Sequence, residues 1–204
     1  PASGEFAATT VEDDGFTGNL GVACAVTPSV RLVANVGQGF RAPNVFDLGT
    51  FGDRPGNRFN VPNPDLESER VTTFDAGWKV LNDRLEGELI GYYSRYRDKI
   101  TSVLTGEVTD SGRLVVQSQN AARLVLYGAE ISVRHRLSDS VESRTQLTWT
   151  RGEETLAGDS YPADRIPPLN GSAGITWRPA TRWTLDGWLN FADVQTAVEV
   201  YTPL

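Results

Sequence analysis

Two short boxes and the segment between them contain the residues whose types could bind a ligand. The first box is Phe40-Arg41-Ala42-Pro43, and the second is Asn63-Pro64-Asp65-Leu66. The segment between the boxes adds Arg54 and Arg58. A guanidinium group binds carboxylates and phosphates through paired hydrogen bonds. Arg41, Arg54 and Arg58 near one loop therefore predict recognition of an anion.

The same boxes also have a purely structural interpretation. Gly37 and Gly39 allow the preceding strand to end and bend, and Pro43 ends its pairing. The Asn63-Pro64 turn then starts a return strand. Turn chemistry explains the Gly and Pro positions. Arg41 is the residue that it explains least. Direct ligand contact and loop shaping both stay open for the two boxes.

The other residues that could take part in catalysis or bind a metal or cofactor lack the partners that such sites need. The single cysteine, Cys24, and the single histidine, His135, allow neither an internal disulfide nor a Cys- or His-based metal site. The stretch from Gly37 to Ala42 matches a G-x-G-x-x-A dinucleotide fingerprint, but Pro43 would fall in the first turns of the required helix. No nucleophile has a suitable histidine base. We expect no enzyme, no cofactor and no metal site.

Composition limits the classes of partner that the chain can bind. The 204 residues have a net charge of −7, which argues against a nucleic-acid surface because such a surface needs clustered Lys and Arg. The chain is 39% hydrophobic, yet no run approaches the roughly eighteen apolar residues of a membrane helix. Any membrane role must therefore use strands, whose alternating lipid-facing and lumen-facing residues average out as polar.

Eight stretches alternate apolar and polar residues with a period of two, which predicts strands. They lie at about 16–26, 30–36, 70–80, 85–93, 127–137, 141–149, 169–177 and 182–192, after a polar loop over residues 1–15. Tight turns near residues 28, 83, 139 and 180 alternate with connections of about fifteen to twenty-five residues, one of which, 100–123, could hold its own hairpin. Short periplasmic turns and long extracellular loops are typical of an outer-membrane barrel.

The expected fold class is all-β: a partial transmembrane β-barrel of about eight antiparallel up-and-down strands. The sheet should be open and curved, so the first and last strands should not pair. The two-residue period also predicts side-chain directions, and a register error of one residue would invert them all. The outer, lipid side should hold Trp78, Tyr93, Tyr127, Trp149, Trp177, Trp183 and Phe191. The concave side should hold Glu86, Glu88, Glu130, Arg144 and Asp186.

The two boxes, in this order around one long loop, resemble the TonB-dependent outer-membrane receptors, especially the haemoglobin, transferrin and lactoferrin receptor branch. Asn120-Ala121-Ala122 followed by Tyr127-Gly128-Ala129-Glu130, and the segment DRIPPLNG at 164–171, are similar to further motifs of the family. The resemblance implies a barrel of about twenty-two strands that surrounds an N-terminal plug and contacts outer-membrane lipid. It also implies import of iron complexes, haem or cobalamin with energy from the TonB complex, in the bacterial outer membrane.

We expect residues 1–204 to be part of a single β-barrel domain from a larger receptor, with the plug domain, which contacts the TonB complex, and the final barrel strands absent. A complete, plug-less eight-strand barrel or porin is the alternative. The strand order argues against it, because both termini would be extracellular, whereas bacterial barrels normally close with both in the periplasm. A soluble carbohydrate-binding sandwich is the third possibility, and it would give a monodisperse monomer without detergent.

The three long connections, 44–62, 101–122 and 153–167, are expected to form the extracellular entrance for an iron chelate. A siderophore is favoured because Arg54 and Arg58 suit an anionic chelate. Haem-importing relatives have a histidine between the two boxes, and none lies between Phe40 and Asn63 here. A haem or haemoprotein receptor of the same family is the alternative ligand prediction.

Overall fold

The computed structural model describes residues 14–194, and almost all of the expected N-terminal loop therefore lies outside the described residues. The strands are β1 (Gly18–Thr27), β2 (Val30–Arg41), β3 (Gly52–Arg54), β4 (Arg58–Val61), β5 (Glu69–Leu81), β6 (Leu85–Val108), β7 (Leu114–Arg136), β8 (Val141–Leu156), β9 (Asp159–Pro162), β10 (Asn170–Ala180) and β11 (Trp183–Ala192). The helix α1 (Val45–Gly49) follows β2. Within the described part of the chain, no helix is long and apolar enough to cross a membrane.

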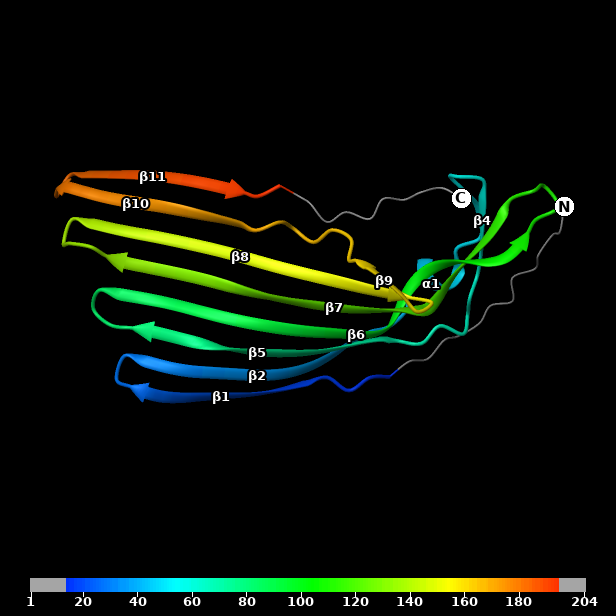
Figure 1. Cartoon of the computed structure of the whole chain (residues 1–204), viewed down its shortest axis with the longest axis horizontal. Helices are drawn as coiled ribbons and strands as arrows, with labels where there is room; N and C mark the ends of the chain where they lie inside the picture. The colour runs from blue at the N-terminus through cyan, green and yellow to red at the C-terminus, as the bar shows by residue number, and fades with distance from the viewer. Residues whose placement is uncertain (1–13, 195–204) are drawn as a thin grey trace.

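The main strands form one sheet in sequential order. That order is β1-β2-β5-β6-β7-β8-β10-β11, and each neighbouring pair along it is antiparallel. β1 and β11 lie at opposite ends of this path, so the sheet is open (Figure 1). The prediction of eight up-and-down strands in an open sheet is confirmed.

The two ends of the sheet differ. Four short turns, between β1 and β2, β5 and β6, β7 and β8, and β10 and β11, gather at the left end in Figure 1. Local chemistry builds them: the Asn82 side chain accepts hydrogen bonds from the backbone N–H groups of Arg84 and Leu85, at 3.0 and 2.9 Å. The longer connections, which include α1, β3, β4 and β9, lie at the opposite end.

Cross-strand register separates an apolar face from a polar one. Phe74, Tyr93 and Tyr127 are direct partners on β5, β6 and β7, and Trp78 pairs with Leu89 in the same orientation. The alternation along each strand puts all seven aromatic residues predicted for the outer side on this one face. Each of them is at least 39% exposed.

The five predicted lumen residues share the opposite face, where Lys79 and Glu88 form an ion pair at 2.9 Å. The predicted division into two faces is therefore confirmed by the register. Trp188 is an aromatic residue on the polar face, where it pairs with Gly174. A Cβ at position 174 would meet the Trp188 ring at 2.5 Å, so glycine is needed there.

The strands reach further than the periodicity predicts. β2 stays in register with β5 through Gly37 and Gly39 as far as Arg41, so the prediction that these glycines end the strand is wrong. The strands β6 and β7 continue into the region expected to be a connection, and its suspected hairpin is their shared tip. The extension of β7 was missed because the consecutive residues Val115 and Val116 are both buried, so its apolar residues do not alternate with a period of two.

The small buried core lies at the long-connection end. Leu66, Val115, Val116, Ala122 and Ala163 are its buried apolar side chains, each at most 7% exposed. Elsewhere the sheet is a single layer with both faces open. Within residues 14–194 the buried apolar packing is therefore concentrated at the end where the two boxes lie.

Candidate functional site

The first box lies at the end of β2. Phe40 and Arg41 are the last two residues of that strand and pair with Arg70 and Glu69 of β5. The Arg41 guanidinium makes two parallel bonds to the Glu69 carboxylate, both at 2.8 Å, and a third from Nη1 to Asp47 Oδ2 at 2.7 Å. Arg41 thus ties the start of β5 to helix α1.

Asp47 also belongs to the cap of α1. The Asn44 side chain accepts from the N–H groups of Phe46 and Asp47 at 2.8 and 3.0 Å, and the Asp47 carboxylate accepts from Asn44 N at 3.0 Å. This reciprocal pair is a capping box. The short helix is therefore held both by its own cap and by Arg41.

Arg41 and Glu69 shift each other's pKa within this cluster. The bonds to Glu69 raise the pKa of Arg41 above its ordinary value, and burial only partly opposes this. Burial raises the pKa of Glu69, but bonds from Arg41 and from the Ile100 amide, which donates at 2.7 Å, outweigh it. The pKa of Glu69 accordingly lies below its ordinary value. Both groups are ionised at neutral pH, and each neutralises the other.

The second box anchors the connection between β2 and β5, residues 42–68, which we term the box loop. Asn63 donates from its side chain to Ser118 O at 2.8 Å and from its backbone to Leu48 O at 2.9 Å. Its side-chain oxygen accepts from Asp65 N at 3.1 Å across the Pro64 turn. Leu66 is 5% exposed and belongs to the small core.

The box loop is folded onto the β6–β7 hairpin. β4 pairs with β7 in parallel, from Arg58 opposite Leu114 to Val61 opposite Gln117. The side chain of Asn120 donates to the carbonyls of Glu67 and Asp98 at 2.8 and 2.7 Å. This segment, predicted as one of the three long connections, is therefore built into the sheet.

The two loop arginines lie at the far end of this structure. Arg54 and Arg58 are direct partners across the β3–β4 hairpin, whose turn contains Gly56 and Asn57, both at positive φ. The Asn57 side chain donates to Gly112 O at 3.0 Å, at the tip of the β6–β7 hairpin. Next to them, Arg113 forms an ion pair with Asp53. Arg54 is exposed and has no side-chain ion pair or hydrogen bond with any residue of the described range.

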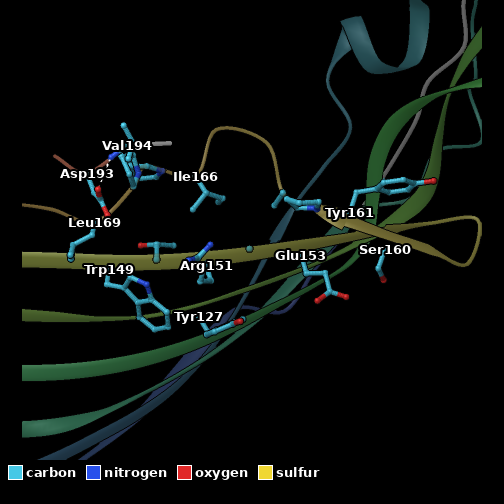
Figure 2. A pocket seen from close by; sticks show the side chains of 16 residues that line it. Tyr127, Trp149, Arg151, Glu153, Ser160, Tyr161, Ile166, Leu169, Asp193 and Val194 are labelled. Atoms are coloured by element: carbon cyan, nitrogen blue, oxygen red, sulfur yellow. Dashed lines mark hydrogen bonds between the residues drawn. The ribbon is translucent and has the colours of Figure 1, made fainter. Parts of the chain in front are cut away.

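The third connection is partly strand. β8 and β9 meet at a two-residue turn, Ala157-Gly158, in which both residues have positive φ, as a type I′ hairpin turn requires. The segment that follows β9 and residues 149–153, in the second half of β8, line a cavity of about 540 Å³ (Figure 2). Tyr127, Trp149 and Arg151 line it, and the Tyr127 and Trp149 rings make an edge contact with centroids 5.9 Å apart.

The structure brings some predicted site residues together and separates others. Arg41 and the second box meet at the base of the box loop through α1, whereas Arg54 and Arg58 share its hairpin. Arg41 does not join the other two arginines, since its three side-chain bonds go to Glu69 and Asp47.

Sequence reasoning missed two residues here. Glu69, three residues after the second box, binds Arg41, and Asn120, quoted only as part of a motif, holds the box loop to β6 and β7. The signal for Glu69 was its place as the first residue of the return strand, directly opposite the end of β2. His135 pairs with Leu85 at the short-turn end of the sheet, far along the strands from the box loop. In residues 14–194 no group of three or more His, Cys, Asp or Glu side chains could hold a metal ion.

Comparison with known proteins gives a consistent result. A family model described as TonB dependent receptor-like, beta-barrel matches residues 2–202. The iron-regulated outer membrane virulence protein of Vibrio cholerae is 26% identical over 176 residues, which cover 80% of this chain and 26% of that protein. The ferric aerobactin receptor of Klebsiella pneumoniae is 22% identical over 188 residues, which cover 86% of this chain and 24% of that protein.

The fold has close counterparts among solved structures. The copper transporter OprC superposes with a TM-score of 0.70 at 20% identity, over 90% of this chain and 28% of that one. At this identity the likeness concerns the fold alone. The chain spans about a quarter of the length of the curated relatives that it matches.

Proposed function

Because the chain belongs to the TonB-dependent receptor β-barrel family, which is located in the bacterial outer membrane, we propose that it forms one sector of the barrel wall of a receptor that imports a ferric siderophore. In this proposal residues 1–204 are part of one β-barrel domain. The rest of the barrel and a plug, which contacts the TonB complex, belong to the whole receptor. The whole protein is then a transporter and not an enzyme.

The proposal depends on one observation, the arrangement of Arg54 and Arg58. They are direct partners on a hairpin at the long-connection end, which is extracellular in such barrels. Arg54 is exposed and has no side-chain partner in the described range, so its guanidinium fork is available to a negatively charged chelate.

The nature of the iron ligand follows from the side chains at this end. No histidine lies among residues 42–68, 101–122 or 153–167, so these connections offer guanidinium groups to a chelate and no imidazole to a haem iron. The name of the Klebsiella relative, a ferric aerobactin receptor, agrees with an anionic chelate. The haemoglobin-receptor branch remains a prediction from the two boxes.

In this proposal the boxes have a positioning role, and Arg54 and Arg58 a ligand role. The bonds from Arg41 to Glu69 and Asp47 support this division, because they engage three of its five guanidinium N–H donors. Asn63 and Leu66 likewise hold the box loop in place, Asn63 by its bond to Ser118 O and Leu66 by its burial.

The test is iron-limited growth of cells that express the full-length receptor, supplied separately with haem and with a panel of siderophores. We expect growth on at least one anionic siderophore and a reduced uptake rate when Arg54 and Arg58 are both changed to Ala. Arg84→Ala/Arg136→Ala, which removes two exposed arginines at the short-turn end, is the matched control and should transport normally. Growth on haem alone that persists in the Arg54→Ala/Arg58→Ala variant would restore the haem alternative.

A further inference from the structure

A set of arginines continues the apolar face of the sheet beyond its last aromatic row. Register places Arg70 on the same face of β5 as Phe74, and it places Arg123 on the same face of β7 as Tyr127. We term the complete set the outer-wall arginines: Arg70, Arg95, Arg97, Arg123 and Arg151. All five are exposed.

These side chains lie close to one another. Arg70 and Arg97 are direct cross-strand partners, which puts their Cβ atoms about 5 Å apart. Arg95 lies one row nearer the aromatic residues, about 7 Å along the strand. Arg123 pairs with Thr155 next to the bulge that contains Arg97, and Arg151 pairs with Tyr127. The set therefore spans four adjacent strands as one surface.

Within residues 14–194 no carboxylate is bonded to this set. None of the five makes an ion pair or a side-chain hydrogen bond with a residue in that range. Glu153 shares their face, Asp98 lies in the bulge of β6 and Asp14 lines the same hollow as Arg70, yet none of the three is bonded to them. The five guanidinium groups are therefore available to an external anion.

On the polar face of the same sheet, a carboxylate of the protein neutralises a pair of facing arginines. Arg134 and Arg144 are also direct cross-strand partners, but Glu142 bridges them, with bonds to the two Nε atoms at 3.3 and 2.9 Å. Directly opposed like charges destabilise a sheet unless an anion lies between them. On the polar face Glu142 supplies that anion, and no residue of the range 14–194 is bonded between Arg70 and Arg97.

The position of the set indicates where its anion comes from. Phe74, Tyr93 and Tyr127 form an aromatic row, and such rows mark the boundary of the apolar band in outer-membrane barrels. The outer-wall arginines lie in that row or just beyond it, at the level of lipid headgroups. Hollows flank them on both sides, since Arg151 lines the cavity of Figure 2 and Arg70, with Phe40, lines another of about 390 Å³.

We propose that the outer-wall arginines bind the phosphate groups of a phosphate-bearing lipid in the outer leaflet. Guanidinium forks match phosphate oxygens, and the aromatic row beneath them packs against the apolar part of the same lipid. This site is on the outer wall and is separate from the ligand entrance. It would fix the depth of the receptor in the membrane whatever chelate is transported.

The experiment measures lipid binding to the full-length receptor in detergent by native mass spectrometry. The probes are diphosphoryl lipid A, its dephosphorylated form and neutral phosphatidylcholine. The test variant is Arg70→Gln/Arg97→Gln/Arg123→Gln. The matched control is Arg84→Gln/Arg136→Gln/Arg182→Gln, which removes the same charge from exposed positions at the short-turn end. A third variant, Arg70→Lys/Arg97→Lys/Arg123→Lys, retains the charge without the guanidinium fork.

We expect the native receptor and the control to bind diphosphoryl lipid A more tightly than the other two lipids. The test variant should lose about 10- to 100-fold in affinity, and the Lys variant should lose less, because charge without the fork is retained. Equal losses in the test and control variants would reduce the effect to net charge and overturn the proposal. Displacement of the lipid by inorganic phosphate at the same concentration would also overturn it, because the site would then bind a free anion.

Discussion

Arginine occurs at both ends of the box loop. We call the end at Arg41 and the second box the base, and the β3–β4 hairpin the tip. At the base, Arg41 is bonded to Glu69 and Asp47, and Leu66 is buried. At the tip, Arg54 is exposed on a three-residue strand that pairs only with β4. Arginine alone therefore does not identify a ligand site, since its partners decide whether it positions the chain or meets a ligand.

This difference separates stability from recognition along one loop. Substitutions at the base should loosen the loop, and substitutions at the tip should leave it folded and change only what it binds. Loops that vary on a rigid support are the usual place for recognition. Four substitutions or conditions test the division, and each is measured on the full-length receptor.

The largest effect is expected at Leu66. Leu66→Ala removes a side chain that is 5% exposed and leaves a cavity at the base, which should cost about 2 to 5 kcal/mol of loop stability. Amide hydrogen exchange over residues 42–68 should become faster. Leu104→Ala is the control. This side chain, on the β6–β7 hairpin, is 54% exposed, so its loss should change exchange little. Equal protection in the two variants would contradict a supporting role for the second box.

The next effect is expected at Arg41. Arg41→Ala leaves Glu69 and Asp47 without their partner, but the Arg41 side chain is 45% exposed, so solvent screening limits the loss to about 1 to 2 kcal/mol. Arg41→Lys keeps the charge without the two parallel bonds and should lose less. Proteolysis of the box loop measures both. Unchanged cleavage together with loss of ligand binding would instead make Arg41 a ligand contact.

A smaller effect is expected from acid. The pKa of Glu69 in the folded chain lies below its ordinary value of 4.5, so its contribution is complete above pH 4.5 and is lost as pH falls through the lower folded pKa. The raised pKa of Arg41 has no effect in this window, because Arg41 remains protonated. Exchange protection factors at the base, which are corrected for the pH dependence of intrinsic exchange, should fall below about pH 4.5, and Glu69→Gln should remove this pH dependence. Persistence of the full acid response in Glu69→Gln would assign it to other carboxylates.

The smallest effect on stability is expected at the tip. Arg54→Ala removes an exposed side chain that has no partner in the described range, so loop stability should change by no more than about 0.5 kcal/mol in either direction. Binding of an anionic siderophore should fall in the same protein. A loss of exchange protection across the whole box loop would show that the tip also supports the fold, and the comparison of base and tip would fail.

The sequence by itself determined the main sheet. Alternation with a period of two located eight strands, and because a register shift would invert every side chain, it also assigned the aromatic residues and the carboxylates to opposite faces. Short-range turn chemistry, such as that of Asn82, located the tight turns. The family followed from the two boxes, since their residues and order are local features of the chain.

Tertiary structure alone decided the roles of the polar residues. Nothing near Arg58 in sequence indicates that β4 pairs in parallel with β7, or that Asn63 bonds to Ser118, 55 residues away. The bridge from Glu142 to two arginines, and the unbridged pair Arg70 and Arg97, likewise depend on cross-strand register. Apolar burial leaves a periodic pattern in the sequence, whereas the partner of a charged side chain is set by which distant strand lies beside it.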